Sequence, residues 1–366
     1  MRLGWFLFLA LGLRFEAAAV TQTNLFVSGA DGYHTYRIPA IVVGTNGTIL
    51  AFCEGRRDGR GDSGKIDMLL RRSLDGGNTW EPQRLLRSDH DNVCGNPAPV
   101  VDRETGEIFL LTTWNRGSDT EKAILGGESS DTRRVFAMSS RDNGATWSEA
   151  REITAQVKKP HWRWYATGPC NGIQLVLGSH KGRLVVPANH SDHSDPSKHY
   201  FRSHVIYSDD HGVTWKIGGV EDEKTNESTL VELGNGKLLQ NMRSYHGKNC
   251  RAIATSEDAG LTWSPVVLET NLVDSVCQAS MLRCSSGEIL FANPASRKRE
   301  NMTVRLSGDD ARTWSRSRQL YAGPSAYSCL AQLPDGTILC LYERGLKSPY
   351  ETICLERFPP GWVESH

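Results

Sequence analysis

Polar and charged side chains recur at fixed offsets from a repeated phrase in this chain of 366 residues. About nine or ten residues before a turn glycine stand Arg37, Asn96, Glu227, Gln278 and Tyr327, and seven residues after one stand Glu54, Arg243 and Glu343. Any one of these residues alone is more typical of a solvated or ion-paired surface group. The shared register instead indicates a polar pocket, where arginine forks could hold a carboxylate and a glutamate could move a proton.

The phrase that sets this register predicts β-hairpins. A glycine flanked by polar residues and followed by apolar ones occurs six times, as TNGTIL (45–50), ETGEIF (104–109), HKGRLV (180–185), GNGKLL (234–239), SSGEIL (285–290) and PDGTIL (334–339). Such a pattern is typical of two strands joined by a tight turn. Six hairpins spaced by about fifty residues, without helical periodicity between them, predict six strand-rich units.

A second repeat, an eight-residue box, follows each of the first five hairpins. Its copies are SLDGGNTW (73–80), SRDNGATW (140–147), SDDHGVTW (208–215), SEDAGLTW (256–263) and a degenerate SGDDARTW (307–314). The serine and aspartate can bond turn amides, the glycine allows a tight bend, and the tryptophan can fill the space between sheets. Five equivalent copies cannot converge on one site, so the box is interpreted as a structural device.

These repeats predict an all-β fold, a six-bladed β-propeller of antiparallel four-stranded sheets. The absence of a sixth box fits a ring in which N-terminal and C-terminal strands share one blade. No linker is evident, so residues 20–366 are expected to form a single catalytic domain. The innermost strands of such a ring would bring the polar positions together.

The chain resembles the exo-α-sialidases, six-bladed hydrolases that remove terminal sialic acid from glycans. The resemblance rests on YRIP at 36–39 followed by the boxes, and it runs from about residue 25 to residue 355. Carried over by motif, it implies an arginine triad for the sugar carboxylate at Arg37, Arg243 and Arg305. Arg57 would contact the far side of the sugar, and Glu343 would hold the first arginine in place.

The same resemblance implies three catalytic residues. The acid/base aspartate falls on Asp62 in GRGDSG, with Asp58 as a competitor, the nucleophile falls on Tyr327 in PSAYSCL, and Glu227 assists it. A neutral phenol avoids the repulsion that a carboxylate nucleophile would meet beside the sugar carboxylate. Because arginines near Asp62 should lower its pKa while a general acid must keep its proton, activity is expected to be best below neutral pH.

The remaining sequence features narrow the classes of partner. The chain has 42 lysine and arginine residues and 42 aspartate and glutamate residues, so it has no net charge that would favour binding to nucleic acid or to an anionic membrane.

Residues 1–19 have the charge, apolar run and small residues of an export signal, and no run is long enough for a membrane span. Nine cysteines without regular spacing do not form a disulfide framework, although one or two bridges remain open.

Neither a metal nor another cofactor is expected, since HSDHSDPSKHY (190–200) suits a polar loop better than a metal site. HWRWY (161–165) fits either an aromatic rim facing substrate or a packing cluster between sheets.

With the resemblance to the exo-α-sialidases, the sequence predicts a retaining exo-α-sialidase acting on sialylated glycoproteins, glycolipids or oligosaccharides. A trans-sialidase and a sialic-acid-binding propeller lectin remain the alternatives.

Overall fold

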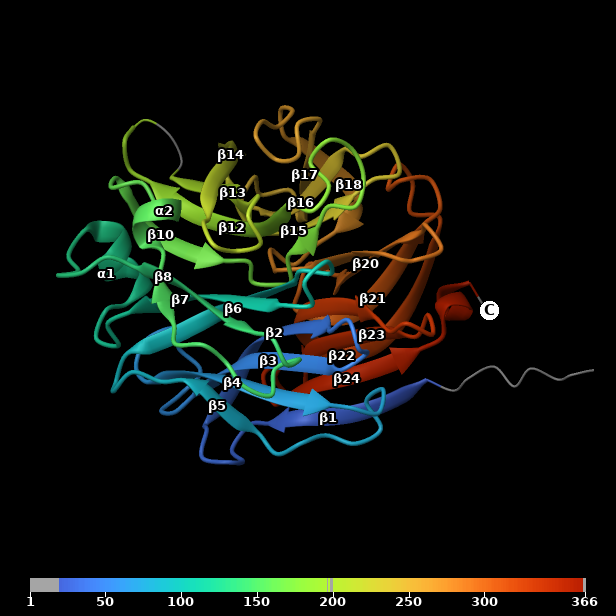
Figure 1. The fold of residues 1–366 in the computed structure, drawn as a ribbon, viewed down its shortest axis with the longest axis horizontal. Helices are drawn as coiled ribbons and strands as arrows, with labels where there is room; N and C mark the ends of the chain where they lie inside the picture. The colour runs from blue at the N-terminus through green and yellow to red at the C-terminus, as the bar shows by residue number, and fades with distance from the viewer. Residues whose placement is uncertain (1–19, 196, 198–199, 365–366) are drawn as a thin grey trace, which may run out of the picture.

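The computed structural model describes residues 20–195, 197 and 200–364, and the expected export signal at residues 1–19 lies outside this part of the chain. Nearly all of the regular secondary structure is β-strand, and the strands follow one another around the molecule from the N-terminus to the C-terminus (Figure 1). The helical segments are short: α1 (Glu121–Gly126), α2 (Thr154–Val157) and the 3-10 turn η1 (Pro360–Val363). No helix of the described residues has the length and apolar character that a membrane crossing requires.

The first half of the chain forms three antiparallel groups of strands. The first contains β2 (Thr35–Val43), β3 (Ile49–Arg56), β4 (Ile66–Ser73) and β5 (Arg84–Arg87). The second contains β6 (Val93–Val101), β7 (Ile108–Asn115), β8 (Arg134–Ser140) and β9 (Arg151–Glu152). The third contains β10 (Trp162–Thr167), β11 (Ile173–Gln174), β12 (Leu184–Asp192), β13 (Phe201–Ser208) and β14 (Lys216–Glu223).

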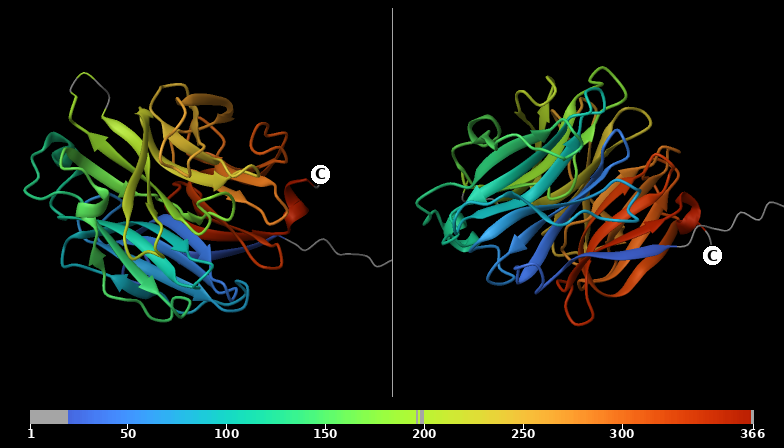
Figure 2. Two further views of the ribbon diagram at one scale, coloured as in Figure 1. Left: turned by 45° about the horizontal axis from the view of Figure 1, so that its top comes forward. Right: turned by 60° about the horizontal axis from the view of Figure 1, so that its bottom comes forward.

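The second half of the chain repeats the pattern and returns to the N-terminal strand. The fourth group contains β15 (Thr225–Glu232), β16 (Leu238–Ser244), β17 (Cys250–Ser256) and β18 (Val267–Val273). The fifth contains β19 (Ser280–Arg283), β20 (Ile289–Pro294), β21 (Glu300–Ser307) and the first half of β22 (Arg316–Gln332). The second half of β22 pairs with β23 (Ile338–Arg344), which pairs with β24 (Thr352–Phe358), and β24 pairs with β1 (Thr21–Val27) (Figures 1 and 2).

The predicted hairpins are confirmed. Each of the six turn glycines, Gly47, Gly106, Gly182, Gly236, Gly287 and Gly336, lies between two paired strands at a φ between 77° and 104°. This left-handed conformation is readily adopted only by glycine. The glycine phrase therefore marks the same place in every group.

The boxes also occupy one equivalent place, the turn before the last strand of a group. In the second group the Ser140 hydroxyl lies 2.8 Å from Asp142 Oδ1 and accepts the Gly144 amide, while Asp142 accepts both the amide and the hydroxyl of Thr146. The tryptophan that closes this box, Trp147, packs against the core between the first two groups. The box therefore stabilises a turn and fills an intersheet space, as its composition predicts.

The core consists of apolar layers between neighbouring groups of strands. One layer packs Phe52 and Leu70 of the first group against Leu110 of the second, and corresponding layers follow along the chain. A further layer packs Ile41 of the first group against Leu341 of the last. Because every group is buried between two others, the inner ends of β2, β6, β15 and β22 are held close to one another.

Candidate functional site

A polar cavity of about 190 Å³ opens where the inner strands meet. Its wall is dominated by charged, amide and aromatic side chains: Arg37, Glu54, Arg56, Asp62, Asn96, Glu121, Arg133, Trp164, Asn189, Asn226, Glu227, Arg243, Tyr245, Arg299 and Tyr327. We call this cavity the central pocket. Most of the residues found by sequence register therefore lie together, although Gln278 does not: its side chain donates to the carbonyls of Pro169, Ala279 and Ser328 and is buried among them.

Bulges in the inner strands explain how these side chains reach the pocket. The pairing register shifts between Arg37 and Ala40 in β2, and between Gly95 and Ala98 in β6. Corresponding shifts leave residues 226–227 of β15 and 326–327 of β22 outside the ladder. A bulge re-aims the side chains beside it. The recurring offset in the sequence is thus the recurring position of a bulge.

Tyr327 and Glu227 form the closest pair in the pocket. The Tyr327 hydroxyl donates to Glu227 Oε1 at 2.5 Å, and Arg243 Nη1 donates to Glu227 Oε2 at 2.9 Å and lies 3.4 Å from the hydroxyl. Burial, and then the charge of Glu227, raise the pKa of Tyr327 well above its ordinary value, although Arg243 and Arg299 act against them. The phenol is therefore protonated at rest, with a carboxylate in position to accept its proton.

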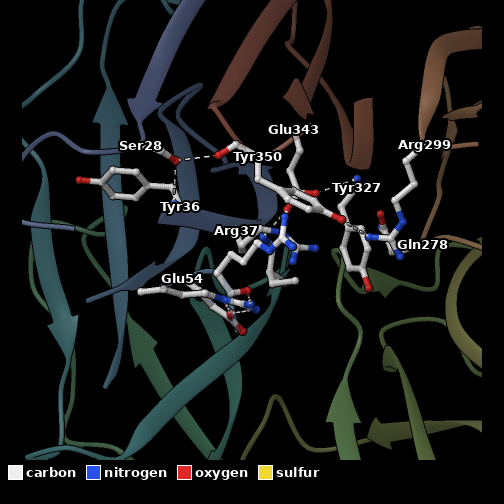
Figure 3. Close-up of polar contacts among 12 residues, drawn as sticks. Ser28, Tyr36, Arg37, Glu54, Gln278, Arg299, Tyr327, Glu343 and Tyr350 are labelled. Carbon is white, nitrogen blue, oxygen red and sulfur yellow. Dashed lines mark hydrogen bonds and ion pairs between the residues drawn. The ribbon is translucent and has the colours of Figure 1, made fainter. Parts of the chain in front are cut away.

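Two further arginines flank the tyrosine. The Arg37 guanidinium lies 5.2 Å from the centroid of the Tyr327 ring and 4.1 Å from that of Tyr350. Arg299 lies 5.5 Å from the Tyr327 centroid and donates to the Tyr350 hydroxyl at 2.7 Å (Figure 3). With Arg243, these side chains place three guanidinium groups around one phenol, an arrangement suited to an anionic ligand group.

Glu343 lies behind the pocket wall and connects two of its parts. Its Oε1 accepts from Arg37 Nε at 2.7 Å and from the Ile38 amide at 2.9 Å, while its Oε2 accepts from the Tyr327 amide at 3.1 Å (Figure 3). The carboxylate is fully buried. Glu343 therefore fixes Arg37 and the Tyr327 backbone in one geometry, as the resemblance implied for the first arginine, and it does not itself line the pocket.

The structure does not bring Arg305 into the pocket, and this corrects the expected triad. Arg305 lies within β21, where its Nη1 donates to Asn293 Oδ1 at 2.8 Å. Arg299 instead precedes β21 and lines the pocket. Six residues along a strand amount to about 20 Å, so the two arginines cannot serve the same place. The motif TVRLS suggested the arginine inside the strand, whereas the turn before the strand supplies the one at the site.

The placement of Arg57 is corrected by one residue. Glu54 and Arg56 lie two apart on β3 and both line the pocket, but Arg57 turns away, with Nε 3.3 Å from Asp67 Oδ2 and its guanidinium 4.3 Å from the Tyr33 centroid. Successive strand residues point to opposite faces, so a slip of one residue reverses the side chain. Arg56 is the guanidinium that faces the cavity.

Arg56 also organises the loop that carries Asp62. Its Nη2 binds Asp62 Oδ1 at 2.7 Å and Glu54 Oε2 at 2.6 Å, and its Nη1 donates to the carbonyls of Arg60 and Gly61 at 2.6 and 3.0 Å. The Asp62 side chain is 59% exposed, in keeping with a group at the edge of the pocket. Asp58, the competitor for the acid role, is not among the residues that line the cavity.

The electrostatics of Asp62 match the expectation from sequence. Burial acts to raise the pKa of Asp62, but the charges of Arg56 and Arg37, the hydrogen bond from Arg56 and the charge of Arg133 outweigh it, so the pKa lies below its ordinary value. The carboxylate form is thus favoured. A general acid in this place keeps its proton only at acid pH.

Several pocket residues were not predicted as site residues. Arg133 is 2% exposed, donates to Asn96 Oδ1 at 2.6 Å and lies 3.7 Å from the Trp164 centroid. Glu121, the first residue of α1, also lines the pocket, and burial raises its pKa. Neither residue stands at a repeated offset. The two tryptophans of HWRWY lie in different places: Trp164 lines the pocket, whereas Trp162 packs in the core.

Comparisons with known proteins identify the family of the chain. The model of the BNR repeat-like domain matches residues 47–340. A sialidase of Micromonospora viridifaciens is 35% identical over 342 residues, which cover 89% of this chain and 52% of that protein, so the chain spans about half its length. An exo-alpha-sialidase of Aspergillus fumigatus is 32% identical over 385 residues, which cover 95% of this chain and 89% of that protein.

A solved sialidase structure has a fold similar to that of this chain. The structure of Hadza microbial sialidase Hz136 superposes with a TM-score of 0.83 at 31% sequence identity, covering 93% of this chain and 69% of that chain. The compared regions cover more than nine tenths of this chain. The chain therefore belongs to the sialidase family of BNR-repeat proteins.

Proposed function

We propose that this protein is a retaining exo-α-sialidase that hydrolyses terminal α-linked sialic acid from glycans. The observation that supports this most directly is the 2.5 Å contact between the Tyr327 hydroxyl and Glu227 inside a ring of three arginines. Binding alone would need the arginines, whereas a phenol coupled to a carboxylate is suited to nucleophilic attack. The substrate class follows from the sialidase relatives and from the charge of the pocket.

In the first step of the proposed reaction, Arg37, Arg243 and Arg299 hold the sugar carboxylate and orient the anomeric carbon. The Tyr327 oxygen bonds to that carbon as its proton passes to Glu227 Oε1. The bond from the anomeric carbon to the leaving glycan oxygen breaks, and Asp62 gives that oxygen a proton.

In the second step, Asp62 takes a proton from water, and the water oxygen replaces Tyr327 on the anomeric carbon. Glu227 returns its proton to the phenol. Two inversions leave the configuration unchanged, so the product is released as the α-anomer. Because Asp62 must be protonated at the start and arginine charges lower its pKa, turnover should be greatest on the acid side of neutrality.

We also propose that the six groups of strands are the blades of one closed propeller formed by residues 20–366. The pairing of β1 with β24 and the apolar layer between the first and last groups support closure. Closure by the N-terminal strand would explain why the last group has no box. Export through residues 1–19 is part of the same proposal, and it rests on composition alone.

The decisive experiment measures release of a fluorescent phenol from its α-sialoside across acid to neutral pH. Tyr327→Phe should lose turnover by about 1000-fold or more, because the nucleophile is removed. Tyr321→Phe is a matched control, since Tyr321 lies on the same strand but donates to the Gly345 carbonyl outside the pocket. Asp62→Asn should be compared on a natural sialylated oligosaccharide, whose poorer leaving group depends more on the acid.

Product analysis in the same experiment separates the alternatives. Free sialic acid of retained configuration supports hydrolysis, whereas transfer to another glycan, or to the sugar's own hydroxyl, would indicate a trans-sialidase. A folded wild-type protein that binds sialylated glycans without any turnover would overturn the enzymatic proposal in favour of a lectin.

A further inference from the structure

Two buried cysteines meet where the loop after β10 contacts β22. Cys170 follows β10 in the loop formed by residues 168–172, and Cys329 lies on β22 two residues after Tyr327. Their sulfur atoms are 3.3 Å apart, and both residues are 0% exposed. All nine cysteines are buried thiols, but within the described residues this is the one pair whose sulfur atoms are in hydrogen-bond contact.

The loop that carries Cys170 is anchored to distant parts of the chain. The side-chain amide of Asn171 donates to the backbone carbonyls of Ile41 in β2 and Leu330 in β22, at 3.4 and 3.1 Å. The Gly172 amide donates to the Pro99 carbonyl in β6 at 2.8 Å. These bonds hold Cys170 against Cys329 although the two are 159 residues apart in the sequence. The sulfur contact is therefore fixed by the surrounding backbone.

We propose that Cys170 and Cys329 form a disulfide that ties the loop after β10 to the strand bearing Tyr327. A disulfide requires a sulfur separation of about 2.05 Å, so the two atoms need to approach by little more than about 1 Å. This inference goes beyond the proposed sialidase reaction and does not depend on it, because it rests on the thiol contact alone.

The chemistry is an ordinary exchange with a small-molecule disulfide such as oxidised glutathione. The Cys170 thiolate attacks one sulfur of the oxidant and releases one reduced thiolate. The Cys329 thiol then loses its proton and attacks the Cys170 sulfur, which releases the second reduced thiolate. The two protein thiols lose two electrons and two protons, and the oxidant is reduced to two thiols.

Hydrogen bonds around Cys170 favour its thiolate once the loop has packed against β22. Burial acts to raise its pKa, but hydrogen bonds from Cys329, from Ser280 and from the Asn171 backbone outweigh it, and the pKa lies below that of an ordinary thiol. Because both sulfurs are inaccessible in the folded protein, exchange should be fast while the chain folds and slow once it is folded.

The test uses the full chain refolded from denaturant with and without a buffer of oxidised and reduced glutathione. After acid quenching and denaturation, free thiols are labelled with a mass tag, and peptides are mapped without reduction. Protein refolded with oxidant should carry two fewer tags and yield one cross-linked peptide pair containing Cys170 and Cys329. Reduced, already folded protein placed in the same buffer should acquire the link much more slowly.

Variants and stability complete the design. Cys170→Ser and Cys329→Ser should each abolish the difference in tags between the two buffers, whereas Cys284→Ser, a buried cysteine at a turn, should retain it. A link across so long a loop should raise the Tm of the wild type by about 5 °C relative to the reduced form. A cross-link between other cysteines, or full tagging after oxidative refolding of the wild type, would overturn the proposal.

Discussion

At the scale of single residues, the central pocket depends on whether an arginine lies in the turn before β21 or within that strand. Arg299 and Arg305 lie six positions apart and differ in environment: the first lines the pocket and donates to Tyr350, whereas the second donates to Asn293 outside the pocket. The proposed reaction needs a guanidinium only in the first place. A comparison of the two residues therefore tests the corrected triad.

Arg299→Met should weaken use of an α-sialoside by about 10- to 100-fold in kcat/KM, the effect of losing one or two charge-assisted hydrogen bonds. Arg305→Met should leave kcat/KM within about twofold, even where it lowers Tm. The measurement is steady-state hydrolysis by proteins whose folding has been checked by circular dichroism. If Arg305→Met were the variant that lost activity, the assignment from the structure would be wrong.

The neighbouring residues Arg56 and Arg57 provide a second residue-scale prediction. Arg56→Met removes the guanidinium that lowers the pKa of Asp62, so the acid should stay protonated to higher pH. The descending limb of the plot of kcat/KM against pH should therefore move toward higher pH, although the maximal rate falls because the loop loses its anchor.

Arg57→Met is the matched control for this prediction. Arg57 contacts Asp67 and Tyr33 and does not line the pocket, so the position of the limb should not change. A limb that stays fixed in Arg56→Met, or that moves equally in both variants, would show that Asp62 is not the acid whose titration limits the reaction.

At the scale of elements, the bulges explain why part of the site could be predicted from the sequence. Arg37, Asn96, Glu227 and Tyr327 were found because a bulge recurs at a similar distance before four of the six turn glycines, and a repeated distance is visible in the sequence. Arg299 lies in a turn outside that register. A turn has no period, so sequence reasoning had only a motif for the third arginine and placed it on the wrong residue.

The eight-residue box gives the element-scale prediction. Gly212 in the third box has a φ of 77°, and a Cβ there would lie 2.4 Å from ring atoms of Phe109 in the neighbouring group. Gly212→Ala therefore combines backbone strain with overpacking and should lower the free energy of unfolding by about 2 to 4 kcal/mol. Urea unfolding measures this, while kcat of the folded variant should remain unchanged.

The degenerate fifth box supplies the control. There Ala311 already occupies the equivalent position with a φ of 61°, and its amide still donates to Ser307 at 2.9 Å. Ala311→Gly should change the free energy of unfolding by no more than about 1 kcal/mol, because relief of strain is offset by a lost apolar contact and by the flexibility of glycine. Equal effects of the two substitutions would contradict the role assigned to the Phe109 contact.

At the scale of the whole molecule, the fold was more predictable than the pocket. A hairpin glycine marks every group of strands and a box marks five of the six, while the apolar layers between groups follow from strands whose two faces are both buried. The contribution of β22 to two groups, and of α1 to the pocket wall, could not be predicted. Both depend on tertiary packing that leaves no periodic trace in the sequence.

The stability of the whole molecule should depend on one buried carboxyl group remote from the proposed chemistry. Glu221 at the end of β14 is 3% exposed, and its two oxygens lack a hydrogen-bond partner among the described residues. Burial raises the pKa of Glu221 well above its ordinary value. A carboxyl group whose pKa is raised by folding makes its full contribution to the free energy of unfolding at low pH. That contribution is lost as the pH rises toward the pKa of the group in the folded protein.

Glu221→Gln removes this titration while preserving the shape of the side chain. Relative to the wild type, the variant should gain free energy of unfolding at roughly 1.4 kcal/mol per pH unit from about pH 4.5 upward, until the folded carboxyl ionises. Urea unfolding at pH values between 4.5 and 7.5 measures the difference. A constant difference between Glu221→Gln and wild type at every pH would mean that Glu221 ionises as easily in the folded protein as in the unfolded chain.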